Sequence, residues 1–256
     1  MPDYPYEEHE DAYREEAERR YERLKKDAGD VITESDQPLG TAGFAGIAGT
    51  WVYAKTREHN LRPQSTLPTS TDEYEWFDRY ARRSYDEGQQ FARRAMEARG
   101  IDPPRTPGVD QSPRHRHALT EVHERQRRYW GRLATDLSDD VKVTLRELPE
   151  GASISQARAA LHDRIEKKGL YRAGLIAGTE PNWAFNRAIL EEYADAGIEN
   201  VDIDVTWETA GDNKVCERCA LRSGTYSVDQ AREMMEEGDF PEHSLCRCVF
   251  LPSASA

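Results

Sequence analysis

Cysteine and histidine residues form two short clusters near the end of the sequence. Cys216 and Cys219 are separated by two residues, and after a further 23 residues His243 is followed closely by Cys246 and Cys248. Zinc is held by four nitrogen or sulfur ligands in a tetrahedron, and a C-x2-C turn places two thiolates on one side of it. The second cluster would close the site, so the spacing predicts a zinc centre.

The two clusters offer five donors, one more than a tetrahedral zinc site requires. In an extended strand Cys246 and Cys248 face the same side, so both could point inward together with Phe250. The first ligand set is therefore the four cysteines, with His243 as an alternate ligand or a supporting group. In the next set His243 replaces Cys246 or Cys248.

Two other interpretations of these residues stay open. Disulfide bonds between the clusters would use similar geometry once the protein leaves a reducing cytoplasm. A catalytic metal is disfavoured, because four protein ligands leave no open position. With zinc or with disulfides, a 33-residue segment rich in Asp and Glu would be closed against the strand that carries Trp207.

Two stretches of alternating residues predict β-structure. From Val201 to Trp207, apolar side chains alternate with Asp and Thr, which is typical of a half-buried strand. A shorter alternation, Val141–Val143–Leu145, predicts a second strand-like piece. The longer strand would support the closed segment.

Helices are expected over most of the remaining chain. Ser153 and Gln156 form a capping box for a helix that would end at Gly169, and Pro181 fits the first turn of a later helix. The expected helices cover residues 1–28, 71–99, 117–137, 153–168 and about 179–197, with a short helix between the last two.

The N-terminal region combines a charged helix with an apolar segment. The segment Leu39–Ala54 is too short and too rich in Gly and Ala to span a bilayer, but its small residues would let another helix approach closely. The helix before it has a thin apolar stripe and needs a partner for stability. That stripe consists of Tyr6, Tyr13, Ala17, Tyr21 and Leu24.

Four prolines within residues 101–113 mark the clearest boundary in the chain. We expect residues 1–60 to be a docking arm, residues 61–113 to be a helix and a proline-rich linker, and residues 114–256 to be a compact domain. The expected fold class is α+β and predominantly helical. An extended N-terminal helical region would precede a compact helical domain, whose small β-element is closed by the Cys/His cluster.

The composition excludes several classes of protein. Lys and Arg total 35 against 48 Asp and Glu, and a net charge of −13 excludes a generally basic, nucleic-acid-coating protein. The acidic N-terminus predicts no secretory signal. An acid-rich chain with 28 Arg and only 7 Lys suggests a host with a high-salt cytoplasm. No nucleophile–base arrangement or phosphate loop stands out, so we expect no enzyme.

Residues 114–132 are an exception to the acidic character, with six Arg, two Glu and three His. The arginines could bind DNA phosphates or could pair with acidic residues of this chain. We interpret His115, His117 and His123 as part of a solvated basic face, because the neighbouring arginines would repel a metal cation.

An ordered set of residues extends from Tyr171 to Pro252. It comprises Ile176-Ala177-Gly178-Thr179-Glu180, Ala188, Tyr193, Ala196-Gly197, Trp207-Glu208-Thr209, Asp212, Val215, Gly224 and the Cys/His motif. This set resembles the C-terminal domain of the phage Mu F-type minor head proteins, also called head morphogenesis proteins. The family usually has Arg where Gly178 stands and Pro where Ser244 stands.

The resemblance implies a minor head protein of a tailed virus, bound to the portal protein at the portal vertex inside the capsid. Such a protein acts in head assembly, genome packaging or DNA delivery, and is located in the virion after assembly in the host cytoplasm. A haloarchaeal tailed virus would fit the composition. The alternative function is a zinc-ribbon nucleic-acid-binding module. The arginines that could contact packaged double-stranded DNA are Arg114, Arg116, Arg125, Arg127, Arg128 and Arg132.

Overall fold

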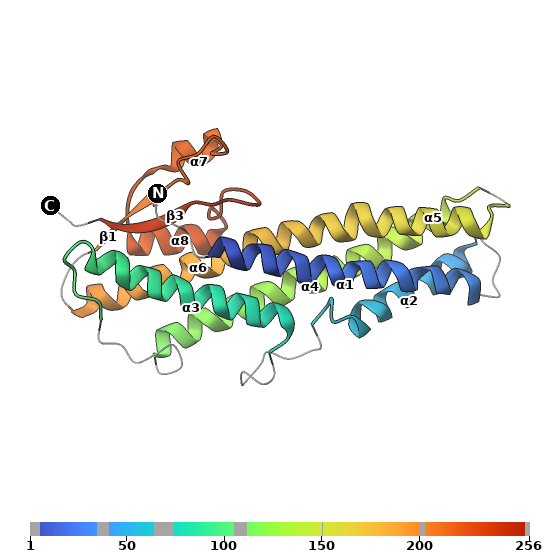
Figure 1. The fold of residues 1–256 in the computed structure, drawn as a ribbon, viewed down its shortest axis with the longest axis horizontal. Helices are drawn as coiled ribbons and strands as arrows, with labels where there is room; N and C mark the ends of the chain where they lie inside the picture. Colours follow the sequence, from blue (N-terminus) through green and yellow to red (C-terminus); the bar gives the residue numbers. More distant parts are fainter. Residues whose placement is uncertain are drawn as a thin grey trace. The chain divides into compact units, whose positions relative to one another are not determined.

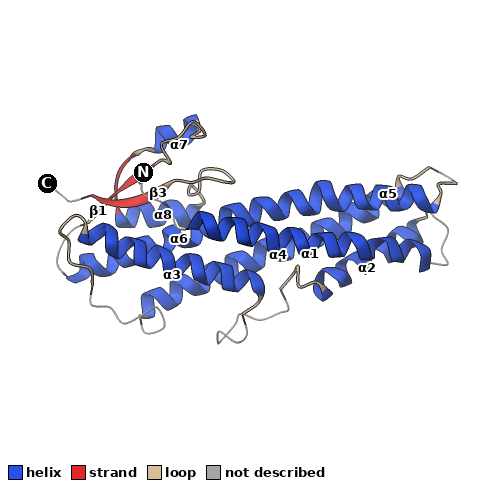
Figure 2. Ribbon diagram, viewed as in Figure 1, coloured by secondary structure: helices blue, strands red, loops and turns tan. Residues whose placement is uncertain are grey.

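Helices account for most of the computed structural model, which describes residues 6–34, 41–63, 74–104, 112–149, 151–199 and 203–253 (Figure 1 and Figure 2). The expected class, α+β and predominantly helical with a small β-element, is confirmed. The elements in order are α1 (Tyr6–Glu34), α2 (Ala42–Glu58), α3 (Trp76–Glu97), α4 (Pro113–Arg146), α5 (Ile154–Arg164), η2 (Ile165–Leu170), α6 (Tyr171–Glu199), β1 (Asp204–Glu208), α7 (Glu217–Arg222), β2 (Gly224–Ser227), α8 (Val228–Glu237) and β3 (Val249–Ser253).

The chain packs as two compact units, each assembled from segments that are distant in the sequence. Unit 1 joins Met1–Asp11, Phe77–Glu124 and Gly178–Ala256, and unit 2 joins Ala12–Trp76 and Arg125–Ala177. The long helices α1, α4 and α6 therefore each contribute to both units.

Unit 2 buries the apolar stripe of α1. The Tyr13 hydroxyl donates to Gln126 Oε1 at 2.7 Å and accepts from Trp130 Nε1 at 2.8 Å, so the polar atoms inside this contact are paired. Gly169 allows close approach, because a Cβ there would lie 2.6 Å from the Tyr21 ring. The stripe residues with at most 1% exposure are Tyr13, Ala17, Tyr21 and Leu24.

The Gly/Ala-rich segment forms α2, which packs one of its sides into unit 2. The Thr41 hydroxyl caps the helix by accepting the Phe44 N–H at 3.1 Å. On the other side Ile47 and Tyr53 are 46% and 36% exposed. No helix in the described part of the chain is long and apolar enough to cross a membrane. The buried residues of α2 are Phe44, Ala45, Ala48, Gly49, Val52 and Thr56.

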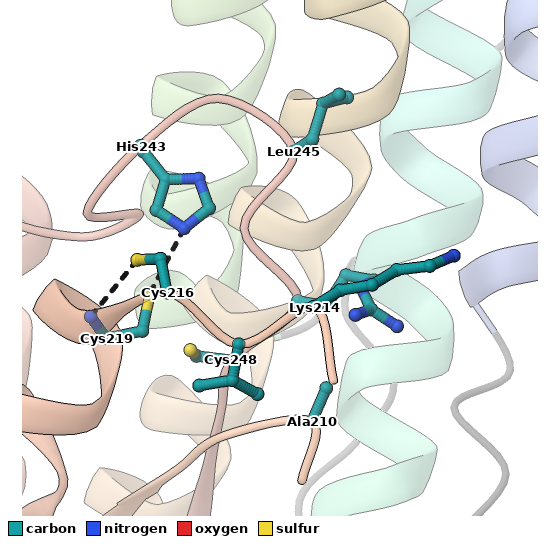
Figure 3. A pocket seen from close by; sticks show the side chains of 9 residues that line it. Ala210, Lys214, Cys216, Cys219, His243, Leu245 and Cys248 are labelled. Atoms are coloured by element: carbon teal, nitrogen blue, oxygen red, sulfur yellow. Dashed lines mark hydrogen bonds between the residues drawn. The ribbon is translucent and has the colours of Figure 1, made fainter. Parts of the chain in front are cut away.

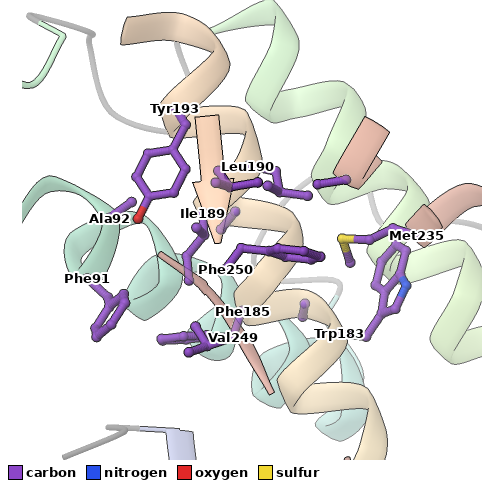
Figure 4. Close-up of a cluster of buried hydrophobic side chains, with 14 of the residues drawn as sticks. Phe91, Ala92, Trp183, Phe185, Ile189, Leu190, Tyr193, Met235, Val249 and Phe250 are labelled. Atoms are coloured by element: carbon purple, nitrogen blue, oxygen red, sulfur yellow. The ribbon is translucent and has the colours of Figure 1, made fainter. Parts of the chain in front are cut away.

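The core of unit 1 is built around α6 (Figure 4). Phe185, Ile189 and Tyr193 recur every four residues along this helix and are completely buried. Helix α3 approaches α6 closely at Gly88, where a Cβ would lie 2.1 Å from the Phe185 carbonyl oxygen. Only a residue without a side chain fits this helix crossing.

The sheet of unit 1 has the order β2-β1-β3, and β1 is antiparallel to both neighbours. The expected alternation is confirmed for the described residues, since Val205 and Trp207 are buried; Val201 lies outside them. Trp207 makes edge contacts with Phe240 and Phe250, with ring centroids 5.1 and 5.6 Å apart.

Three local expectations were wrong because helices continue where the sequence suggested a break. Val141 and Leu145 are buried one helical turn apart in α4, whereas Val143 is 45% exposed, so this alternation belongs to a helix and not to a strand. Gly169 does not end a helix but lies in η2, a π-helical turn between α5 and α6. Pro181 likewise lies inside α6 rather than in a first turn.

The capping box expected at Ser153 and Gln156 is confirmed. Its side chains and backbone N–H groups bond reciprocally at the start of α5, at 2.9 and 3.2 Å.

Candidate metal centre

Both cysteine clusters lie in unit 1, at the start of α7 and in the loop before β3 (Figure 3). Cys216 is the N-cap of α7, and its Sγ accepts the N–H of Cys219 at 3.3 Å. In the other cluster the N–H of Cys246 donates to the His243 carbonyl oxygen at 3.2 Å, and Cys248 directly precedes β3. Two tight turns thus present the donors.

The five donors form two overlapping groups. We call Cys216, Cys219 and His243 the outer trio, and Cys219, Cys246 and Cys248 the inner trio; within each, the ligand atoms lie within 4.8 Å of one another. Cys219 belongs to both, with its Sγ 3.2 Å from His243 Nε2 and 3.8 Å from Cys246 Sγ. Cys246 and Cys248 face the same buried side, as their spacing predicted.

These distances fit metal ligands and not disulfide bonds. With zinc–sulfur bonds of about 2.3 Å, two thiolates of a tetrahedral site lie about 3.8 Å apart. A disulfide requires about 2.05 Å between its sulfurs, and all four cysteines are free. The donor set of thiols and an imidazole is the one that zinc prefers.

Burial and mutual hydrogen bonds give the four thiols different pKa values. Burial raises the pKa of Cys219 to about 12, whereas a hydrogen bond with Cys248 lowers the pKa of Cys246 to about 6. The pKa of Cys248 is raised by that same hydrogen bond and by burial, and a backbone N–H of Cys219 lowers the pKa of Cys216. A bound cation would favour the thiolate form of its ligands.

An ion pair joins the two clusters from outside. Arg247 lies between Cys246 and Cys248 in the sequence, and its guanidinium binds Asp212 Oδ2 at 2.7 Å. Asp212 also accepts the Lys214 N–H at 2.9 Å, which shapes the turn before Cys216. Arg247 and the backbone N–H of Lys214 lower the pKa of Asp212.

Sequence reasoning missed a set of polar side chains on α6 that hold the second cluster. Thr179 accepts the Leu245 N–H, Asn182 donates to the Cys246 carbonyl oxygen, and Asn186 bonds Cys248 and Phe250. The spacing of these polar residues, three and four apart along α6, was the available signal, since buried polar groups need partners.

The three histidines of α4 do not form the solvated basic face that we expected. His115 is buried, with Tyr85 Oη at 2.8 Å from its Nδ1 and Glu192 Oε2 at 3.2 Å from its Nε2. His123 is also buried and lies 3.0 Å from Asp78. Only His117 is strongly exposed among them. His115 and His123 are therefore interior residues paired with acidic groups.

Some of the arginines expected to contact DNA form ion pairs with acidic residues of this chain. In unit 1, Arg114 binds Asp195 at 2.9 Å. In unit 2, Arg127 lies 3.4 Å from Glu75. Both pairs match the alternative in which acidic residues of this chain neutralise the basic stretch.

The matching family model is described as Phage Mu protein F like protein, and it covers residues 140–251. This range begins near the end of α4 and includes β1, β2, the first part of β3 and all five donors. No curated protein sequence and no solved structure matches the chain. Over residues 140–251 the chain is therefore similar to the Phage Mu F-like head morphogenesis proteins.

Proposed function

We propose that this protein is a structural minor head protein of a tailed virus, bound at the portal vertex inside the capsid. It would act there in head assembly, genome packaging or DNA delivery. The observation that carries the proposal is the family match over residues 140–251, which includes the whole Cys/His centre. The family's structural role also supports a function without catalysis.

The proposed role of the Cys/His centre is to hold a structural zinc ion. Its five protein donors leave no coordination position open for a substrate, so a bound ion would stabilise the fold and not catalyse a reaction. The segment between the clusters includes α7, β2 and α8, of which the six-residue α7 is too short to be stable alone. The ion would fasten this segment to the loop at the start of β3.

The charge around the centre argues against the alternative of a zinc-ribbon module that binds nucleic acid. Residues 195–242 carry 13 acidic and 4 basic side chains. Such a surface repels phosphates, whereas nucleic-acid binding depends on neutralising them with Lys and Arg.

The face of α4 proposed for contact with packaged DNA lies in unit 2. Arg125, Arg128 and Arg132 recur at helical spacing beside Tyr129. The guanidinium carbons of Arg125 and Arg128 lie 5.0 and 5.9 Å from the Tyr129 ring centroid. Replacing Arg128 and Arg132 by Gln should weaken DNA binding and reduce its salt dependence, since each phosphate contact contributes about −0.9 to the log–log slope.

The exposed side of α2 is the proposed contact with the portal protein. It combines Ile47 with Gly46, around which a Cβ would meet nothing within 4 Å, so a partner helix could approach closely. An apolar side chain that is half exposed on a helix of small residues gains free energy when a partner covers it.

Co-purification with the portal protein of the same virus tests this docking surface. Ile47→Asp should abolish co-purification without unfolding the protein. Ile154→Asp is the matched control, because Ile154 is also about half exposed, at 50%, but lies on α5. Equal co-purification of both variants with the portal would exclude the α2 face as the contact.

A further inference from the structure

The residues around Cys246 and Cys248 run beside α6 without a neighbouring strand on that side. They precede β3, whose ladder to β1 begins only at Val249. Buried backbone groups need hydrogen-bond partners, and a chain that lacks a strand neighbour must find them elsewhere. Three side chains of α6 supply these partners.

Hydrogen bonds from the side chains of α6 hold the loop backbone at several positions from Leu245 to Cys248. Thr179 Oγ1 accepts the Leu245 N–H at 3.0 Å, and Asn182 Nδ2 donates to the Cys246 carbonyl oxygen at 2.7 Å. Further along, Asn186 Nδ2 donates to the Cys248 carbonyl oxygen at 3.2 Å. Asn186 Oδ1 accepts the Phe250 N–H at 2.9 Å, so one side chain binds both the end of the loop and β3.

The two asparagines also fix each other. Asn186 Nδ2 lies 2.6 Å from Asn182 Oδ1, and both side chains are almost completely buried, at 0% and 1% exposure. Buried and mutually bonded amides have little rotational freedom. They therefore hold the loop backbone at defined positions.

Thr179 binds the loop at Leu245, the residue with the least favourable backbone conformation. Leu245 has φ of +62°, a left-handed conformation that a residue with a Cβ rarely adopts. This residue lies between His243 and Cys246, so its conformation sets the turn that brings these two donors together. The hydrogen bond from its N–H to Thr179 helps to maintain it.

We propose that Thr179, Asn182 and Asn186 are positioning residues of the metal centre, which orient the half-site of His243, Cys246 and Cys248 from α6. This inference rests on the proposed zinc site. Groups that orient metal ligands without touching the ion commonly change metal affinity by about 10–100-fold when they are removed. The three side chains would set the affinity of the centre, and not only the stability of the loop.

The test measures metal binding by the full-length protein. Zinc affinity is determined by chelator competition, and the Co²⁺-substituted protein is examined by absorption spectroscopy, which reports ligand geometry. Thr179→Val and Asn182→Ala should each weaken zinc binding by about 10–100-fold and change the cobalt spectrum. Thr179→Ser keeps the hydroxyl acceptor and should restore both properties.

Leu190→Ala is the control for stability alone. Leu190 is fully buried on the same helix but has no polar atom to offer the loop. This variant should melt at a lower temperature while its zinc affinity, measured where circular dichroism shows it folded, stays that of the wild type. The Thr179→Val and Thr179→Ser pair keeps the test decisive if Asn182→Ala does not fold.

Two results would overturn the inference while leaving the metal centre in place. One is equal zinc affinity in wild type, Thr179→Val and Asn182→Ala. The other is an equally large loss of affinity in Leu190→Ala, which would reduce the effect to general stability. If the wild type binds no zinc or cobalt, the metal centre itself is refuted together with this inference, whereas the family match over residues 140–251 stands.

Discussion

Replacing Cys219 by Ser should damage the metal centre more than replacing Cys216. Cys219 belongs to both trios, so without it no three of the remaining donors form either group. After Cys216→Ser the inner trio stays complete, and His243 Nε2 is still 3.2 Å from Cys219 Sγ as a fourth donor. The fifth donor thus compensates for one loss but not for the other.

The magnitude follows from the free energy of structural zinc sites. Such sites contribute roughly 10–16 kcal/mol in zinc-finger peptides, or about 2.5–4 kcal/mol for each of four ligands. For a chain of this size a loss of about 1 kcal/mol lowers the melting temperature by roughly 2–4 °C. Cys219→Ser should therefore lower it by about 5–15 °C, and Cys216→Ser by clearly less.

Thermal melting and limited proteolysis, each with and without a chelator, measure this difference. Zinc-loaded Cys219→Ser should melt below zinc-loaded Cys216→Ser, and the chelator should lower its melting temperature less than it lowers that of the wild type. Its first cleavage sites should lie within residues 209–248. Equal melting temperatures for the two variants, or a wild type that is insensitive to the chelator, would refute the assignment of Cys219 as the shared ligand.

Three further predictions concern the rest of the fold. Glu191 is fully buried, 3.2 Å from Arg187 and 3.1 Å from Arg232, so Glu191→Ala should cost about 3–5 kcal/mol in urea denaturation; a loss below about 1 kcal/mol would contradict this burial. Gly88→Ala should cost about 1–3 kcal/mol because its Cβ would meet the Phe185 carbonyl oxygen at 2.1 Å, whereas Gly46→Ala, with open space, should stabilise α2 by up to about 1 kcal/mol. Melting temperatures measured from 0.1 to 4 M KCl should rise steeply up to about 1 M, as the Debye length falls from ~10 to ~3 Å around a chain of net charge −13. Melting temperatures that do not change with KCl would refute the hypothesis of a host with a high-salt cytoplasm.

The sequence was sufficient to predict features that depend on local pattern. The apolar stripe of α1 and the capping box at Ser153 depend on helical spacing, and both are observed. The side-by-side arrangement of Cys246 and Cys248 follows from the two-residue period of an extended chain.

Features that depend on tertiary packing were not predictable in the same way. Gly169 has the residue type of a helix end, but its small size serves the contact with the Tyr21 ring. The period of Val141, Val143 and Leu145 fits a strand as well as a helix, and only burial separates the two. The spacing of Asn182 and Asn186 indicates a polar contact of α6, but their partner is a loop about 60 residues away in sequence, which no local pattern identifies.

Quantitative mass spectrometry of purified, DNA-filled particles tests the central claim most directly. The particles are those of the virus whose genome encodes this chain. The proposed function predicts peptides of this protein at a level comparable with the portal protein and far below the major capsid protein. Particles that contain portal and capsid peptides but none from this protein would contradict its assignment as a minor head protein.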